Sequence, residues 1–241
     1  MTDDRVRQRP YTLLSCGMSL DGFLDDASDQ RLMLSNDADF DRVDEVRAAS
    51  DAILVGAATV RNDDPRLQVR SPERVGRRRA AGLPAQPLKV TVTNRAKLDA
   101  DAKFFTVGSG PKLVYCASDT LDMASEHLSS LATVVDGGRP VELRRVSEDL
   151  HARGVRRLMV EGGGEVHTQF LTEGLADELQ LVIAPLFVGH PGATRFVGAG
   201  RFPWSGSTRA RLVESRPIGD VVLLRYALSS RFKDDLFGAS W

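Results

Sequence analysis

The stretch VEGGGEVHTQF, residues 160–170, places three consecutive glycines between an apolar run and a segment with the pattern of a helix. The run Leu158-Met159-Val160 predicts a strand, and the helix is expected over about residues 165–173. A strand, a glycine-rich turn and a helix can hold a phosphate group, because helix N–H groups point at the anion and glycine lets it approach. A tight turn that only needs a positive φ explains the glycines equally well, so the motif needs support from elsewhere.

Short apolar segments and amphipathic segments alternate on both sides of this stretch. The continuous apolar run AILVG at Ala52–Gly56 is typical of a strand that is buried on both faces. Asn36 or Asp37 is available as the N-cap of a helix expected over residues 39–49. Further strands are predicted over residues 11–18, 88–93, 112–116, 131–135, 157–160 and 178–186, and further helices over residues 119–131 and 141–153.

This alternation predicts an α/β fold with a mainly parallel central sheet flanked by helices. An antiparallel C-terminal pair, residues 209–216 and 220–227, is expected at the edge of the sheet, because Pro217-Ile218-Gly219 has the composition of a turn. The chain is interpreted as a single domain over residues 1–241, with residues 229–241 as a tail.

One long segment, residues 70–87, is rich in Arg, Gly and Pro and is predicted to be a surface loop. The run Arg77-Arg78-Arg79 is expected to be a solvated face of that loop.

Composition excludes several classes of protein. Lys and Arg together number 32 against 33 Asp and Glu, which argues against a general nucleic-acid binder. Cys16 and Cys116 lie far apart in no metal-ligand spacing, so we expect buried free thiols and no metal site. The first ten residues lack the apolar region of a secretory signal, and no stretch is apolar enough to span a membrane. A cytoplasmic protein is therefore expected.

Small and polar residues follow two further predicted strands. GMSLDG stands at residues 17–22, and GAATVRNDDPRL, with Thr59, Asp63 and Asp64, stands at residues 56–67. Ligands in open α/β sheets collect at the carboxyl ends of strands, so one shared cleft explains the coincidence better than unrelated turns do. Taken alone, Asp63-Asp64-Pro65 is equally consistent with a plain turn.

Three motifs, MSLDG, DAILVGAATVRNDDPRL and VEGGGEVHTQFLTEGLADELQLVIAPLFVG, occur in this order. Together they resemble the reductase domain of bacterial and archaeal riboflavin biosynthesis, the NADPH-dependent 5-amino-6-(5-phosphoribosylamino)uracil reductase. The resemblance runs over about residues 11–228. It implies a dihydrofolate-reductase-like fold, reduction of the phosphoribosyl group to a phosphoribityl group with NADPH, and a homodimer.

The resemblance also implies which residues bind the cofactor. Arg95 follows a predicted strand and is expected to face the 2′-phosphate of NADPH. Residues of the glycine stretch are expected to wrap the pyrophosphate, although His167 is predicted to lie on the helix surface. The implied NADPH residues are Gly17, Leu32, Thr59, Asp63, Asn94 and Arg95, with Gly162, Gly163, Gly164, Glu165, Val166, His167, Thr168 and Gln169.

A second implied set holds the substrate: Gln30, Arg47, Leu67, Arg70 and Glu161. Arginine suits the ribose phosphate because its planar guanidinium binds phosphate oxygens in a bidentate way. Asp21 or Glu161 is the candidate for proton handling or substrate orientation.

The sequence also departs from the family pattern. It lacks the HxE…PCxxC signature of the zinc deaminase that bifunctional members carry, so the chain is not expected to deaminate its substrate. Bifunctional members tend to have lysine at Ser15 and serine at Gln30, and the second change bears on substrate identity. Two alternatives stay open: a reductase of another pterin- or dihydrofolate-like compound, and a non-catalytic nucleotide-binding module.

Overall fold

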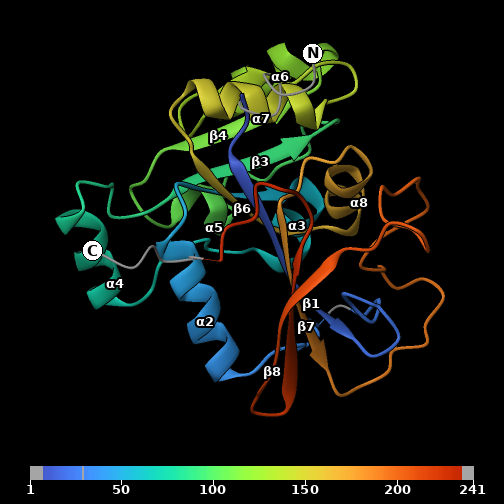
Figure 1. Cartoon of the computed structure of the whole chain (residues 1–241). Coiled ribbons are helices and arrows are strands. Elements are labelled where there is room, and N and C mark those ends of the chain that lie inside the picture. The colour runs from blue at the N-terminus through green and yellow to red at the C-terminus, as the bar shows by residue number, and fades with distance from the viewer. Residues whose placement is uncertain (1–7, 29, 235–241) are drawn as a thin grey trace. The chain divides into compact units, whose positions relative to one another are not determined.

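The computed structural model describes residues 8–28 and 30–234 (Figure 1). The chain divides into two compact units. Among the described residues, the first unit comprises residues 8–11 and 44–159, and the second comprises residues 12–28, 30–43 and 160–234. The end of the predicted tail, residues 235–241, lies outside the described residues.

Parallel strands form the sheet of the first unit, in the order β5-β4-β3-β2. In Figure 1, α6 and α7 lie over β3 and β4, and Tyr115 of β4 donates a hydrogen bond to Asp149 of α7 at 2.6 Å. The strands are β2 (Ala52–Gly56), β3 (Leu88–Thr93), β4 (Lys112–Cys116) and β5 (Thr133–Asp136). The helices are α3 (Ala57–Asp63), α4 (Pro72–Ala80), α5 (Lys103–Thr106), η1 (Ser118–Thr120), α6 (Leu121–Leu128) and α7 (Leu143–Ala152).

The chain passes between the units after Tyr11, within α2 (Asp37–Ala48) and within β6 (Arg157–Gly162). In the second unit, β1 (Tyr11–Ser19) pairs in parallel with β7 (Glu178–Ala184). The antiparallel hairpin of β8 (Arg211–Ile218) and β9 (Val221–Ala227) continues from β7 through β9. Helix α8 (Gly164–Thr172) completes this unit. The predicted α/β class, mainly parallel pairing and antiparallel C-terminal pair are confirmed.

Each unit has its own apolar core. In the first unit, every residue of β2 is buried, as its continuous apolar run predicts, and Ile53 and Val55 pack with Phe104. The core of the second unit includes Leu34, Val182 and Leu223. Cys116 is buried in β4 and Cys16 is partly buried in β1, and both are free thiols, as predicted.

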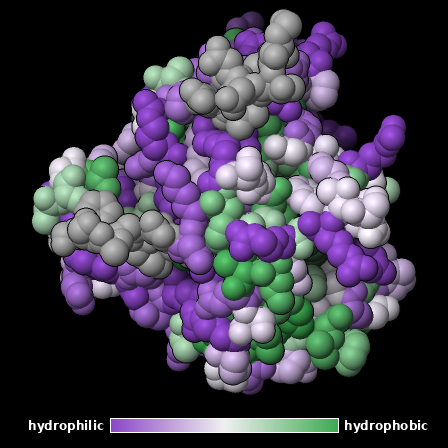
Figure 2. Space-filling model, viewed as in Figure 1, coloured by the Kyte–Doolittle hydropathy of each residue, from purple (hydrophilic) through white to green (hydrophobic). Residues whose placement is uncertain are grey.

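Hydrophobic side chains gather on the surface in the region of β8, whereas polar residues cover α2 (Figure 2). Leu212 of β8 is 51% exposed and Val222 of β9 is 40% exposed. Within the part of the chain that the structure describes, no helix has the length and apolar character needed to cross a membrane.

The predicted loop over residues 70–87 is wrong, because Pro72–Ala80 forms α4. Ser71 caps this helix by accepting a hydrogen bond from the backbone N–H of Arg74 at 3.3 Å, and Pro72 occupies the first turn, where its missing N–H costs nothing. The expected solvated face is also wrong for Arg78, which is 3% exposed. Its guanidinium donates to the backbone oxygens of Ala48, Ser50 and Pro84, and this bonding offsets the burial of the charge.

Other boundaries shift by small amounts. Asn36 is the N-cap of α2, since its Oδ1 accepts a hydrogen bond from the N–H of Asp39 at 3.0 Å. The hairpin turn is Gly219-Asp220, with Gly219 at φ 63°, so it begins two residues later than predicted. The short helices α3 and α5 were not predicted at all.

Candidate functional site

The predicted site residues are divided between the two units. The first unit contains Arg47, Thr59, Asp63, Leu67, Arg70, Asn94 and Arg95. The second contains Gly17, Asp21, Gln30, Leu32, Glu161 and the glycine stretch up to Gln169.

The glycine stretch forms the junction between β6 and α8, as predicted. Gly163 is the N-cap of α8 with φ 91° and ψ 121°, a conformation that side chains disfavour. A Cβ added to Gly164 would lie 2.3 Å from the backbone oxygen of Arg195. The chain itself therefore accounts for two of the three glycines, one through backbone conformation and the other through close approach of the segment at Arg195.

The N-terminal end of α8 is compatible with an anion. The helix dipole and the N–H groups of the first turn favour negative charge there. Glu165 and Gln169 are exposed, whereas Val166 is 6% exposed and His167 fully buried. Val166 and His167 can therefore contact a cofactor only through their backbone.

The expected surface position of His167 is wrong. Its ring is fully buried and packs against Phe196 with ring centroids 5.6 Å apart. Burial lowers the pKa of His167 to about 4, an effect that the backbone of Val160 only partly offsets. The imidazole is therefore neutral at physiological pH and is unsuited to act as an acid.

Thr168, which was predicted to contact the pyrophosphate, forms hydrogen bonds with the protein backbone. Its hydroxyl donates to the backbone oxygen of Gly164 at 2.6 Å and accepts the N–H of Gly198 at 2.8 Å. The same side chain thus joins the first turn of α8 to the segment around Gly198.

Asp21 uses its carboxylate to hold a neighbouring segment. It accepts hydrogen bonds from the hydroxyl of Ser19 at 2.6 Å and from the N–H groups of Gly189 at 2.7 Å and Val188 at 3.1 Å. The bond from Ser19, followed by those from the two N–H groups, keeps the pKa of Asp21 below its usual range despite some desolvation. An ionised carboxylate with these partners is a poor proton donor. Glu161, half-buried near the end of β6, is the better candidate.

The remaining predicted residues of the second unit differ in exposure. Gly17 lies against Leu34, whose backbone oxygen would be 3.1 Å from an added Cβ. Leu32 is partly buried and packs against the core. Gln30 is exposed.

In the first unit, the structure brings several predicted cofactor residues to one edge of the sheet. Strands β2 and β3 are paired in parallel, so the residues that follow them share the carboxyl edge. Thr59 and Asp63 follow β2 on α3, and Asn94 and Arg95 follow β3. Asp63, Asn94 and Arg95 are exposed, while Thr59 is half-buried. The Oδ1 of Asn94 accepts the N–H of Val141 at 2.8 Å, which anchors this residue.

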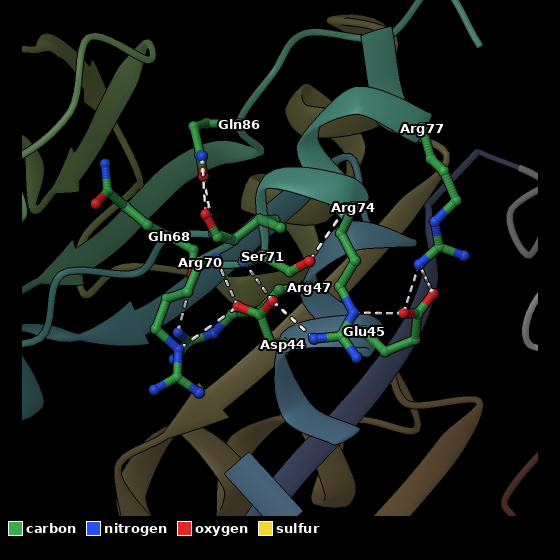
Figure 3. A network of polar contacts seen from close by, with 10 residues as sticks. Asp44, Glu45, Arg47, Gln68, Arg70, Ser71, Arg74, Arg77 and Gln86 are labelled. Atoms are coloured by element: carbon green, nitrogen blue, oxygen red, sulfur yellow. Dashed lines mark hydrogen bonds and ion pairs between the residues drawn. The ribbon is translucent and has the colours of Figure 1, made fainter. Parts of the chain in front are cut away.

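The structure also connects two predicted substrate arginines through one short segment, residues 68–71 (Figure 3). Arg47 donates from Nη1 to the backbone oxygen of Gln68 at 3.1 Å. The N–H of Arg70 donates to Oδ1 of Asp44 at 2.6 Å, and the side chain of Arg70 is 61% exposed. Two guanidinium groups on one framework suit a phosphate, which arginine binds in a bidentate way.

Leu67 does not present its side chain to this surface. It is 1% exposed and belongs to the apolar core of the first unit, with φ at 45°. Contact between Leu67 and a substrate would therefore have to involve its backbone.

Comparison with known proteins adds a family to this geometry. The model of the RibD C-terminal domain matches residues 10–224, which is most of the chain. The chain belongs to the RibD C-terminal domain family. The resemblance inferred from the three motifs is thereby confirmed.

Curated relatives of this RibD-family chain include archaeal proteins of similar length. The chain is 38% identical over 182 residues to the 2,5-diamino-6-ribosylamino-4(3H)-pyrimidinone 5′-phosphate reductase of Archaeoglobus fulgidus, covering 75% of this chain and 83% of the relative. It is 33% identical over 222 residues to the reductase of the same name from Methanothermobacter thermautotrophicus, covering 91% and 99%.

Solved structures of similar fold include RibD of Acinetobacter baumannii, with a TM-score of 0.74 and 26% identity. That match covers 91% of this chain but only 58% of the Acinetobacter chain. A pyrimidine reductase-like protein of Corynebacterium diphtheriae has a TM-score of 0.73 at 21% identity, covering 92% of this chain and 93% of the other, and shows the shared fold. The expected dihydrofolate-reductase-like fold is confirmed by the similarity to RibD structures.

Asp44 and Lys89 are among the buried charged residues of this RibD-family chain that were not predicted. Asp44 holds the segment that carries Arg70. Lys89 of β3 is 1% exposed and donates to the backbone oxygens of Val107 at 2.7 Å and Phe104 at 3.2 Å. Burial lowers the pKa of Lys89 to about 8, and the charges of Lys112 and Arg47 act in the same direction. The spacing of Asp44, one helical turn before Arg47, could have indicated that the two side chains act on the same face of the helix. The sequence of β3 contains no comparable indication that Lys89 is buried.

Proposed function

We propose that this protein uses NADPH to reduce the ribosylamino side chain of a phosphorylated pyrimidine in riboflavin biosynthesis. The observation that carries the proposal is the joining of Arg47 and Arg70 through residues 68–71, a framework suited to a phosphate. Family membership and the names of the archaeal relatives support the reaction class.

One region of each unit is proposed to contact NADPH: the carboxyl edge of the sheet in the first unit and the start of α8 in the second unit. The helix N-terminus suits the pyrophosphate, and the exposed guanidinium of Arg95 suits the 2′-phosphate, so NADPH should bind more tightly than NADH. When bound, NADPH supplies a hydride to C1′ of the ring-opened, imine-like sugar. The protein contributes orientation and fixed charge, and juxtaposition of the reacting groups can account for about 7–11 kcal/mol of the barrier.

A proton must also reach the imine nitrogen as C1′ accepts the hydride. We assign this task, or the orientation of the substrate that permits it, to Glu161 rather than Asp21. The lowered pKa of Asp21 and its bonds to Ser19 and Gly189 support this choice.

The base of the substrate has two candidates. The sequence motifs resemble the reductase of 5-amino-6-(5-phosphoribosylamino)uracil, whereas the archaeal relatives are named for the 2,5-diaminopyrimidinone, which still carries the amino group. Gln30, where bifunctional members tend to have serine, bears on this choice.

The test supplies the pure protein with NADPH or NADH and each of the two pyrimidine phosphates, and follows the loss of nicotinamide absorbance. We expect oxidation of NADPH with at least one pyrimidine and no release of ammonia. Binding of NADPH without oxidation by either compound would instead support a non-catalytic nucleotide-binding module.

We further propose that the protein is a homodimer, as the family resemblance implies. The exposed apolar side chains of Leu212 and Val222 on the β8–β9 hairpin support an interaction surface there. Sedimentation of the wild-type protein and of a Leu212→Glu variant tests this proposal, and a monomeric wild type would contradict it.

A further inference from the structure

Asp44 lies on α2 and has a side chain that is only 2% exposed. Its Oδ1 accepts the backbone N–H of Arg70 at 2.6 Å, and its Oδ2 accepts the backbone N–H of Ser71 at 3.1 Å. Arg74 donates from Nη1 to the same Oδ2 at 3.0 Å. The Oδ1 of Asp44 also lies 3.6 Å from Nε of Arg70, so one carboxylate holds the backbone of two consecutive residues, pairs with the guanidinium of Arg70 and binds an arginine of α4 (Figure 3).

These contacts require a negative charge. Burial acts to raise the pKa of Asp44, but the hydrogen bonds from Arg70, Ser71 and Arg74 outweigh it and hold the pKa below its usual range. A buried carboxylate with three charge-matched or backbone donors is a rigid anchor, because moving any donor would leave charge unsatisfied.

The same helix holds the segment at a second point. Asp44 and Arg47 are three residues apart on α2 and so lie on the same face of the helix. Arg47 binds the backbone oxygen of Gln68, while Asp44 binds the N–H of Arg70. Gln86 also accepts the N–H of Val69 at 2.8 Å and donates to its backbone oxygen at 3.0 Å, so these bonds and the two from α2 together hold the backbone of Arg70 relative to Arg47.

We propose that Asp44 is a positioning residue that holds Arg70 beside Arg47 so that both can bind the phosphate group of the substrate. This inference rests on the proposed function, since it needs the arginines to contact phosphate. Asp44 itself does not contact the reacting groups.

The principal test is Asp44→Asn. The amide keeps the size of the side chain but turns one acceptor into a donor that faces N–H groups. We expect the KM for the phosphorylated pyrimidine to rise about tenfold, with kcat within about twofold of wild type and NADPH affinity unchanged. With the dephosphorylated pyrimidine, the kcat/KM of the variant should equal that of wild type.

Glu45→Gln is the matched control. Glu45 is the next residue of α2 and also pairs with Arg74, as well as with Arg77 at 2.6 Å, so it binds side chains of α4 rather than the backbone of residues 68–71. Loss of this acid should leave the KM for the phosphorylated pyrimidine within about twofold of wild type. An equal rise in KM for both variants would mean that general loss of negative charge on α2, rather than positioning, causes the effect, and would overturn the inference.

The double variant Asp44→Asn/Arg70→Ala separates this inference from the proposed function. If Asp44 acts through Arg70, the double variant should have the KM of Arg70→Ala alone. If Arg70→Ala has no phosphate-specific effect, the proposed phosphate contact is wrong. Two outcomes would contradict the positioning role of Asp44 when Arg70→Ala does have a phosphate-specific effect. In the first, Asp44→Asn leaves the KM for the phosphorylated pyrimidine unchanged. In the second, the double variant shows the full sum of the two single effects on that KM.

Asp44→Glu covers the case in which Asp44→Asn does not fold. It keeps the charge but moves it by one methylene, so it should raise the KM for the phosphorylated pyrimidine and leave that for the dephosphorylated one unchanged. Equal effects on both pyrimidines would contradict the inference.

Discussion

The glycine stretch of the second unit and residues 68–71 of the first unit are both proposed to contact phosphate, but they are held in different ways. At Gly163 and Gly164 the backbone conformation and the nearby oxygen of Arg195 define the turn. Residues 68–71 are instead held by side chains far away in the sequence, those of Asp44 and Arg47 on α2 and that of Gln86. Steric constraints should make the first region sensitive to any added atom, whereas the second should respond to charge.

The largest effect is expected from Gly164→Ala. The new methyl group would lie 2.3 Å from the oxygen of Arg195, so the segment around that residue must move. We expect the free energy of unfolding to fall by about 3 kcal/mol, measured by denaturant titration. Gly76→Ala is the control, because no atom lies within 4 Å of an added Cβ there and the residue is on α4. It should be neutral or stabilising by about 0.5–1 kcal/mol. Equal effects of the two substitutions would show that close packing does not define the turn.

A pH dependence of stability should come from His167, in the same region. Its folded pKa of about 4 lies below the unfolded value of 6.5, so the unfolded state binds the proton more readily. Stability from this group is present above pH 6.5 and is lost as the pH falls towards 4. At about pH 5 we expect the loss to be about 2 kcal/mol.

Unfolding titrations of wild type and His167→Leu at neutral and acid pH measure this effect. The variant should lose less stability on acidification than wild type does. His127→Asn, at an exposed histidine of α6, should leave the pH dependence unchanged. If the free energy of unfolding of His167→Leu depended on pH as steeply as that of wild type, groups other than His167 would cause the loss of stability in acid.

Within residues 68–71, Arg70→Ala should raise the KM for the phosphorylated pyrimidine about tenfold, which corresponds to about 1.4 kcal/mol, and should leave the affinity for NADPH unchanged. Arg70→Lys should recover only part of the loss, since an ammonium group cannot reproduce the guanidinium fork. The dephosphorylated pyrimidine should be insensitive to both changes. If Arg70→Ala lowered kcat/KM by the same factor for the phosphorylated and the dephosphorylated pyrimidine, Arg70 would not bind the phosphate.

The smallest effect is expected from Arg77→Ala. Its side chain is 49% exposed, and its ion pair with Glu45 is therefore screened by solvent. We expect the free energy of unfolding to change by less than about 0.5 kcal/mol and the kinetics to stay at wild-type values. A larger change in the kinetics would mean that Arg77, as well as Asp44 and Arg47, helps to position residues 68–71.

Some parts of this fold follow directly from local pattern. The fully apolar run at Ala52–Gly56 predicts a buried strand, and the glycines after Val160 predict a strand-to-helix junction. Helix α4 also had a local signal in Ser71 and Pro72, but the arginine-rich composition of the segment concealed it.

Other features have only a partial local signal. His167 stands three and four residues before Phe170 and Leu171, on the buried face of α8, and Leu67 alternates with the buried Val69. Periodicity can indicate these faces, but contact with Phe196 or with the core of the first unit joins residues far apart in sequence.

By itself, the sequence determined the α/β class, the glycine junction and the family, because strand burial, backbone freedom and motif order are local properties of the chain. Only the tertiary structure decided that Arg195 requires a glycine at position 164, that Asp21 binds the N–H groups of residues 188 and 189, and that Asp44 binds those of residues 70 and 71. These roles depend on hydrogen bonds and close contacts between residues far apart in sequence, and such distances exist only once the chain has folded.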